Sequence, residues 1–92
     1  MKTVWIDGGA VRDMADVHAR FAAALSFPAW YGSTLDALHD LLSEPTAEDV
    51  TVILENEDAL REALGWRYRA LRRVLADAAA ENGRLTVRMQ EE

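Results

Sequence analysis

The sequence predicts an α/β fold of two layers, in which a three-stranded parallel sheet carries helices mostly on one face. Short runs rich in β-branched and apolar residues occupy 3–7, 50–55 and 84–89, and a stretch of helical periodicity long enough for two helices separates each from the next. Strands joined by helical crossovers of a dozen or more residues are parallel, and such crossovers are right-handed. With 92 residues, the chain is expected to form one domain, 1–92.

Alternation along the strands predicts that only one face of the sheet is covered. Parallel strands that are covered on both faces are apolar at every position, whereas here threonine and arginine dominate every second position. We therefore expect an open face, on which Trp5 and Ile53 are the apolar exceptions. Two right-handed crossovers over the same face give the strand order 1-2-3. The covered face is predicted to consist of Val4, Ile6, Val50, Val52, Leu54, Leu85, Val87 and Met89.

Signals for helix ends delimit the first pair of helices. The first helix is predicted to begin at an Asp13 cap and to end before Pro28, because the residue that precedes proline avoids the helical region. A capping box formed by Ser33 and Asp36 predicts the start of the second helix. The segment 43–49 that follows is rich in polar residues and carboxylates, which is typical of a surface loop.

The second pair of helices is delimited in the same way. Asn56 is predicted to cap the third helix, and Gly65 to break the helical pattern. The periodicity then resumes and ends at Asn82-Gly83, for which we expect a left-handed stop.

Composition excludes several classes of function. Ten Lys and Arg against sixteen Asp and Glu give a net charge of −6, which disfavours binding to nucleic acid and favours a basic protein as partner. The chain contains no cysteine, so a disulfide or thiolate site is excluded and a reducing, cytoplasmic location is expected. No apolar run approaches the roughly 18 residues that span a membrane. No cofactor-binding motif occurs, and no cofactor is expected to bind.

One group of carboxylates stands where a helix disfavours it. Asp36 and Asp40 lie four residues apart, and therefore on one face of the second helix. Asp36 suits the first turn, whereas Asp40 in the last turn meets the negative end of the helix dipole, at a cost of about 0.3–1 kcal/mol. Glu44, Glu48 and Asp49 add further negative charge just after it. Charge in a locally unfavourable position indicates function.

Two aromatic residues precede the same helix. Trp30 and Tyr31 stand on a loop beside Gly32, which permits close approach of another backbone. Such aromatics either pack beneath their loop as core or anchor a partner. Together with the carboxylates they form an apolar anchor with an acidic rim, which suits a cationic protein.

Two other readings of these residues compete with that interpretation. Asp36, His39 and Asp40 would make at most a weak, open metal site. Catalysis by the two aspartates is disfavoured, because a chain of this size cannot build a deep cleft between them. The arginines of 67–73 are best explained as a solvated helix face.

The segment FPAWYGSTLDALHDLL at 27–42 contains the pattern P-x-[WY]-Y-G-x-[NT]-L-D-A-L-x-D-x-L. With this pattern, the chain strongly resembles barstar and its relatives, which are intracellular inhibitors of secreted guanyl-specific ribonucleases. The resemblance implies a barstar-like fold over the whole chain. It also implies that the loop and the second helix block the enzyme's active site, with carboxylates at the positions of RNA phosphates.

Carried over by position, the resemblance assigns roles to individual residues. Asp40 would be the central anchor among the catalytic arginine and histidine side chains of the enzyme, and Asp36 would pair with a neighbouring basic residue. Trp30 would pack against the enzyme. Gly32 and Thr34 would offer backbone and hydroxyl contacts.

The resemblance assigns further contacts around this centre. Tyr31 belongs to the same contact segment, Asp77 would supply a carboxylate from the last helix, and Glu44 with its acidic neighbours would form the rim. The sequence also departs from the family pattern. His39 replaces a tryptophan, so the interface there is smaller and sensitive to pH. Residues 43–49 lack the family's tryptophan and the proline that precedes its second strand.

The prediction from sequence is therefore a cytoplasmic inhibitor that is not an enzyme. It would be monomeric when free and would form a 1:1 complex with a secreted guanyl-specific ribonuclease that has a basic pocket. Two alternatives stay open at this point. One is a module of the same fold that binds a different basic toxin or a partner that is not a nuclease. The other is an enzyme or metal protein that uses Asp36, His39 and Asp40.

Overall fold

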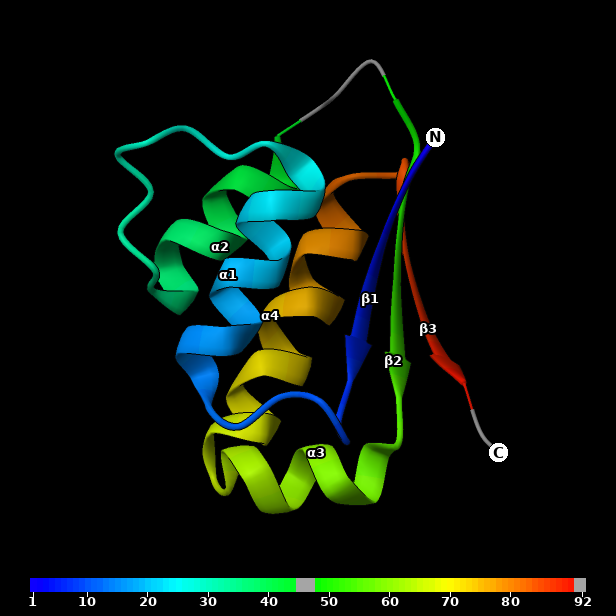
Figure 1. Cartoon of the computed structure of the whole chain (residues 1–92). Helices are drawn as coiled ribbons and strands as arrows, with labels where there is room; N and C mark the ends of the chain where they lie inside the picture. The colour runs from blue at the N-terminus through cyan, green and yellow to red at the C-terminus, as the bar shows by residue number, and fades with distance from the viewer. Residues whose placement is uncertain (45–47, 91–92) are drawn as a thin grey trace.

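The computed structural model describes residues 1–44 and 48–90 and contains a single parallel sheet (Figure 1). Its strands are β1 (Lys2–Asp7), β2 (Val50–Glu55) and β3 (Leu85–Gln90), in the order β1-β2-β3. Both strand pairs are parallel, and Val52 of β2 lies between Val4 and Val87 in the register. The predicted fold class and strand order are confirmed.

The helices connect these strands in pairs. α1 (Met14–Leu25) and α2 (Leu35–Ser43) lead from β1 to β2, and α3 (Glu57–Leu64) and α4 (Arg67–Glu81) lead from β2 to β3. Figure 1 shows α1, α2 and α4 on one side of the sheet and α3 across its lower end, whereas none of the described elements covers the other side. No helix within the described ranges is long and apolar enough to cross a membrane.

The predicted alternation of the strands is confirmed by burial. Val4, Ile6, Val52 and Leu54 are fully inaccessible to solvent, and they pack against helix residues such as Phe21. The core that they form fixes the face of each helix that remains exposed.

The open face of the sheet matches the sequence prediction in outline. Trp5 is 48% exposed there, as expected. Ile53 is only 8% exposed, and in the strand register it lies between Trp5 and Arg88.

Two predictions about helix starts need correction. Thr34, and not Ser33, caps α2, since its Oγ1 accepts a hydrogen bond of 3.1 Å from the amide of Ala37. Ser33 instead takes a left-handed conformation with φ 53°. Asn56 occupies the N-cap position of α3, but its side chain does not cap the helix and donates to Asp7 Oδ1 at 2.6 Å.

That hydrogen bond lies where the segment after β1 packs closely against the segment between β2 and α3. Gly8 lies where β1 ends, and a Cβ atom on it would stand 2.3 Å from the carbonyl oxygen of Asn56. Only glycine fits this approach. The Asn56 bond and the amide of Gly9 hold the pKa of Asp7 below its usual value.

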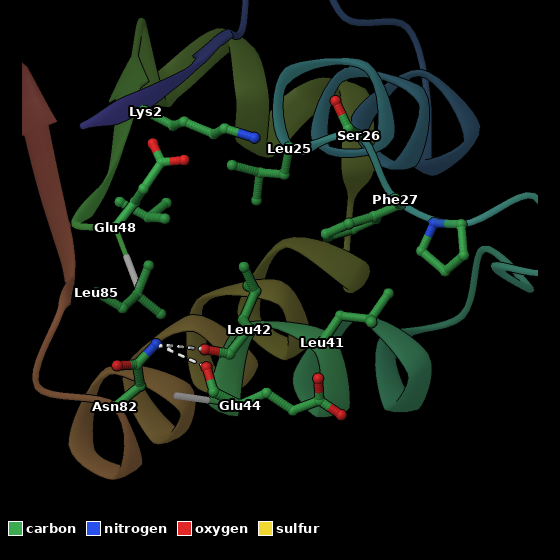
Figure 2. Close-up of a pocket in the computed structure, with 12 residues that line it drawn as sticks. Lys2, Leu25, Ser26, Phe27, Leu41, Leu42, Glu44, Glu48, Asn82 and Leu85 are labelled. Carbon is green, nitrogen blue, oxygen red and sulfur yellow. Dashed lines mark hydrogen bonds between the residues drawn. The ribbon is translucent and has the colours of Figure 1, made fainter. Parts of the chain in front are cut away.

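The end of α4 also differs from the prediction. Gly65 breaks the helical pattern with φ 59°, as expected, but neither Asn82 nor Gly83 is left-handed. Instead, the buried Asn82 side chain donates to the carbonyls of Leu42 at 3.0 Å and Glu44 at 3.3 Å (Figure 2). This asparagine therefore fastens the C-terminal end of α2 to the end of α4.

Candidate functional site

The exposed side of α2 carries two carboxylates that no cation of the described chain neutralises. Asp36 and Asp40 are both exposed, and the Asp40 side chain is 82% exposed. Leu38 and Leu42, on the opposite side of the helix, are buried in the core and hold α2 in this orientation. Within residues 1–44 and 48–90, neither aspartate forms an ion pair with lysine or arginine.

The neighbouring side chain that lies closest to the Asp40 carboxylate in the described ion-pair geometry is the imidazole of His39. Nδ1 of His39 lies 3.8 Å from Asp40 Oδ1, and Nε2 lies 2.9 Å from Glu81 Oε2. The hydroxyl of Ser43 donates to the same Glu81 oxygen at 2.9 Å. His39 therefore stands between two carboxylates that come from different helices.

Sequence reasoning missed Glu81 as a member of this group. The available signal was its spacing, because Glu81 follows Asp77 by four residues and so shares a side of α4 with it. That α4 packs beside α2 follows from the fold and not from any local pattern.

The loop before α2 has an inward and an outward aromatic. The ring of Tyr31 meets that of Phe27 edge-on at 4.8 Å between centroids, and its hydroxyl forms a short hydrogen bond with Nδ1 of His18. Burial raises the pKa of Tyr31 to about 12 and lowers the pKa of the buried His18. Both groups are therefore neutral at pH 7, and Tyr31 fixes the loop from beneath while Trp30 is 74% exposed.

Gly32 and Thr34 lie at the surface between Trp30 and the helix. A Cβ atom on Gly32 would meet nothing within 4 Å, and its φ lies outside the left-handed region. The fold of the described chain therefore does not require glycine at this position. The Thr34 oxygen accepts the capping bond, and its hydroxyl hydrogen stays free to donate outward.

The predicted acidic rim continues from the end of α2. Glu44 is exposed, and Glu48 and Asp49 are exposed beyond the gap. Glu48 lies 3.6 Å from the amino terminus, so part of its charge is compensated. The prediction for the loop 43–49 also covers residues 45–47, which lie outside the described residues.

The hollow shown in Figure 2 lies next to this rim. It has a volume of about 300 Å³ and lies between the ends of α1 and α2 and the starts of the strands. Apolar side chains such as Phe27, Leu42 and Leu85 line it, and Lys2 and Glu48 stand near one another at one side.

The residues that were considered for metal binding do not converge. Asp36 and Asp40 flank His39 on successive turns, but among the described side chains no group of three or more His, Asp or Glu is close enough to hold a metal ion. What the arrangement offers is a rigid, acidic surface with an exposed indole beside it. Such a surface complements a basic, concave site on another protein.

Comparison with known proteins identifies the family. The sequence matches the family described as "Barstar (barnase inhibitor)" over residues 1–90, which is nearly the whole chain. The chain belongs to the Barstar family. No protein of curated function matches it. Members of this family are inhibitors rather than enzymes.

Within this Barstar-family fold, Asp77, the contact expected from the last helix, lies on the same side of α4 as Glu81. Asp77 is exposed, and it stands one turn before Glu81, which reaches His39 of α2. Asp77 has no contact with α2 among the described interactions. The structure therefore extends the acidic surface of α2 onto α4, with Glu81 as the direct link.

Proposed function

We propose that this chain inhibits a secreted guanyl-specific ribonuclease by covering its active site with the exposed face of α2. The single observation that supports this function most strongly is the pair Asp36 and Asp40, exposed and without a neutralising cation in the described structure. Membership of the Barstar family supports the class of partner. The complex is 1:1, the free protein is a monomer, and its location is the cytoplasm of the producing cell.

The mechanism requires no chemistry from the inhibitor. A ribonuclease must bind an anionic backbone, so its active site is a basic pocket, and carboxylates on a rigid helix compete with RNA phosphates for the same cations. Little backbone freedom of α2 is lost on binding, because the helix is already held by its buried leucines and by the Asn82 bonds. Asp40 is the anchor in this proposal, and Asp36 pairs with a second basic residue.

The surrounding residues fit subsidiary roles. The exposed Trp30 packs on the enzyme, Gly32 and Thr34 contribute backbone and hydroxyl contacts, and Tyr31 positions the loop. His39 lies beneath the anchor, between Asp40 and Glu81. The carboxylates of Glu44 and Asp77 form the outer acidic rim.

Titration of a barnase-type ribonuclease with the purified protein tests this function. We expect stoichiometric loss of RNA hydrolysis at a 1:1 ratio, and an association rate that falls steeply as salt is raised, since opposite charges steer the encounter. A fully active ribonuclease in the presence of a large excess of the folded protein would refute the proposal. Residual binding with full activity would also refute it, because the active site would then be open.

A further inference from the structure

A third exposed tryptophan, besides Trp5 and Trp30, lies beyond the N-terminal end of α2. Trp66 follows Gly65 in the bend between α3 and α4 and is 75% exposed, as much as Trp30. The guanidinium of Arg67 stacks over its indole at 4.5 Å and holds the ring at the surface. Nothing in the fold accounts for this pair, since the α3–α4 bend needs neither an aromatic nor a cation at these positions.

A shallow hollow connects this tryptophan with the candidate interface. The hollow has a volume of about 300 Å³, and it is lined by Trp66 and Arg67 at the start of α4 and by Ser33, Thr34 and Leu35 at the start of α2. Met14 of α1 contributes a further apolar part of the wall. The start of α2 is therefore shared by the proposed enzyme-binding surface and by the hollow at Trp66.

The size of a typical protein–protein interface predicts that a bound enzyme also contacts this hollow. A stable complex buries about 800 Å² on each partner and involves roughly 20–30 residues a side. The segment from Phe27 to Glu44 supplies only part of that number. An enzyme centred on Asp40 must therefore cover neighbouring elements as well, and the hollow adjoins Thr34 directly.

The charge at the hollow is opposite to that of α2. Arg67 has no carboxylate partner among the described residues, in contrast with Arg61 and Arg72, which are both paired with Glu57. The surface therefore presents carboxylates along α2 and a cation beside an indole next to the start of α2. A partner that complements both parts has a basic pocket and, at the edge of that pocket, an apolar side chain with a carboxylate beside it.

From this continuity and this reversal of charge we infer that Trp66 and Arg67 form a second docking point for the same ribonuclease, which receives an apolar side chain flanked by a carboxylate. The inference rests on the proposed function. The opposite charges of the two parts fix the orientation of the enzyme on the inhibitor, because a rotated enzyme would place its basic pocket against Arg67.

Binding kinetics of three variants with a barnase-type ribonuclease test this inference. We expect Trp66→Ala to raise Kd by about tenfold or more, mainly through faster dissociation, as truncation of a buried interface tryptophan does. Trp5→Ala is the matched control, because Trp5 is exposed on the far side of the sheet, and its Kd should change by less than about twofold. Thermal unfolding of each variant checks that the exposed substitutions leave the fold intact.

Charge reversal at Arg67 gives the sharpest outcome, because the change in affinity has opposite signs for an enzyme that presents a carboxylate at Arg67 and for one that presents only basic groups there. If the enzyme presents a carboxylate there, Arg67→Glu weakens binding by repulsion. If the enzyme presents only basic groups, the same variant makes the inhibitor more acidic and tightens binding, which would overturn the inference. Wild-type affinity in both Trp66→Ala and Arg67→Glu would also overturn it.

The test separates this inference from the proposed function. Should Asp40→Ala lose inhibition while the Trp66 and Arg67 variants inhibit as the wild type does, the second docking point is wrong and the inhibitor function stands. Absence of any binding by the wild-type protein overturns both. Self-association of the free protein that Arg67→Glu abolishes would identify a second copy of this chain as the occupant and overturn the inference.

Discussion

The carboxylates of α2 and those of α3 carry the same formal charge but stand in opposite surroundings. Asp36 and Asp40 on α2 face solvent, and neither forms an ion pair with an arginine or lysine of the described residues. Glu57 at the start of α3 accepts hydrogen bonds from the hydroxyl of Tyr68 and from Arg72, and it also lies 3.4 Å from Arg61. The number of acidic residues alone does not reveal this difference, which lies in how far each carboxylate is neutralised within the described chain.

The physical consequences differ in the same way. The Tyr68 bond, followed by the charges of Arg61 and Arg72, holds the pKa of Glu57 below its usual value. That carboxylate is already satisfied, so it has little electrostatic field left for another protein. The field of the α2 carboxylates extends into solvent and is available to steer a cationic partner.

The largest expected effect comes from the anchor on α2. Asp40→Ala should weaken the complex with a barnase-type ribonuclease by at least about 30-fold, which corresponds to a hot spot of about 2 kcal/mol. Isothermal calorimetry or inhibition kinetics measures the change. Asp58→Ala is the matched control, since Asp58 is fully exposed on α3 and lies 3.6 Å from Arg61. Equal losses in the two variants would break the comparison between the helices.

Removal of a paired carboxylate on α3 should change the stability of the fold and leave ribonuclease binding unchanged. Glu57→Gln removes the charge that Arg72 and Tyr68 contact, so the midpoint of urea unfolding should fall while ribonuclease inhibition stays at the wild-type level. Glu62→Gln on the exposed side of α3 serves as its control. A Glu57 variant that keeps its stability but loses inhibition would show that α3 also binds the enzyme.

Tyr31 tests whether the division between the two regions is strict, because it lies in the α2 region but packs inward. Tyr31→Phe leaves Nδ1 of the buried His18 without its partner and should lower the free energy of unfolding by about 1–3 kcal/mol. Chemical denaturation measures this loss. The wild-type tyrosine at position 31 should matter for binding only through the placement of the loop. Unchanged stability together with weaker binding would instead identify its hydroxyl as a direct contact.

The same pair predicts how stability depends on pH. Because burial lowers the pKa of His18, the unfolded chain binds this proton more readily, so the contribution of His18 is complete above pH 6.5 and declines as the pH falls below it. Because burial raises the pKa of Tyr31 to about 12, its contribution is complete below pH 10 and is lost between pH 10 and 12. Unfolding midpoints measured across this range should fall both at acidic and at alkaline pH, and Tyr31→Phe should reduce the alkaline fall. An alkaline fall that is the same in Tyr31→Phe would contradict the assignment.

The smallest predicted effect belongs to Asp36. Asp36→Asn should slow association severalfold at low ionic strength, and the difference from wild type should shrink as salt is added, because screening removes long-range steering. Stopped-flow kinetics at several salt concentrations measures this change, with Asp58→Asn as control. A rate loss that is independent of salt would indicate a packing role in place of steering.

Several features of the fold and site follow from local sequence patterns. The alternation of Val4, Ile6 and their counterparts in β2 and β3 specifies the covered face, because a strand exposes successive side chains on opposite sides. Asp36 and Asp40 lie together because both belong to one short helix. The sequence leaves open whether a loop aromatic packs beneath its loop or lies exposed. In the structure Tyr31 packs beneath the loop and Trp30 is exposed, and this division depends on tertiary packing.

Other features depend on contacts between distant segments. Glu81 reaches His39 because α4 packs beside α2, and Asn82 is buried because it bonds carbonyls at the end of α2. No spacing within the sequence encodes either contact. The prediction of Ser33 as the cap of α2 was wrong because both Ser33 and Thr34 are competent caps, and the left-handed turn at Ser33 places Thr34 in the N-cap position.

The claim that α2 meets the enzyme is tested most directly by the backbone amide chemical shifts of the protein, free and in complex with a barnase-type ribonuclease. We predict that the largest changes fall on residues 30–44 and on the end of α4 around Asp77 and Glu81, while α3 from Glu57 to Leu64 stays close to its free-state shifts. Changes confined to α3 or to the open face around Trp5, with α2 unperturbed, would contradict the account.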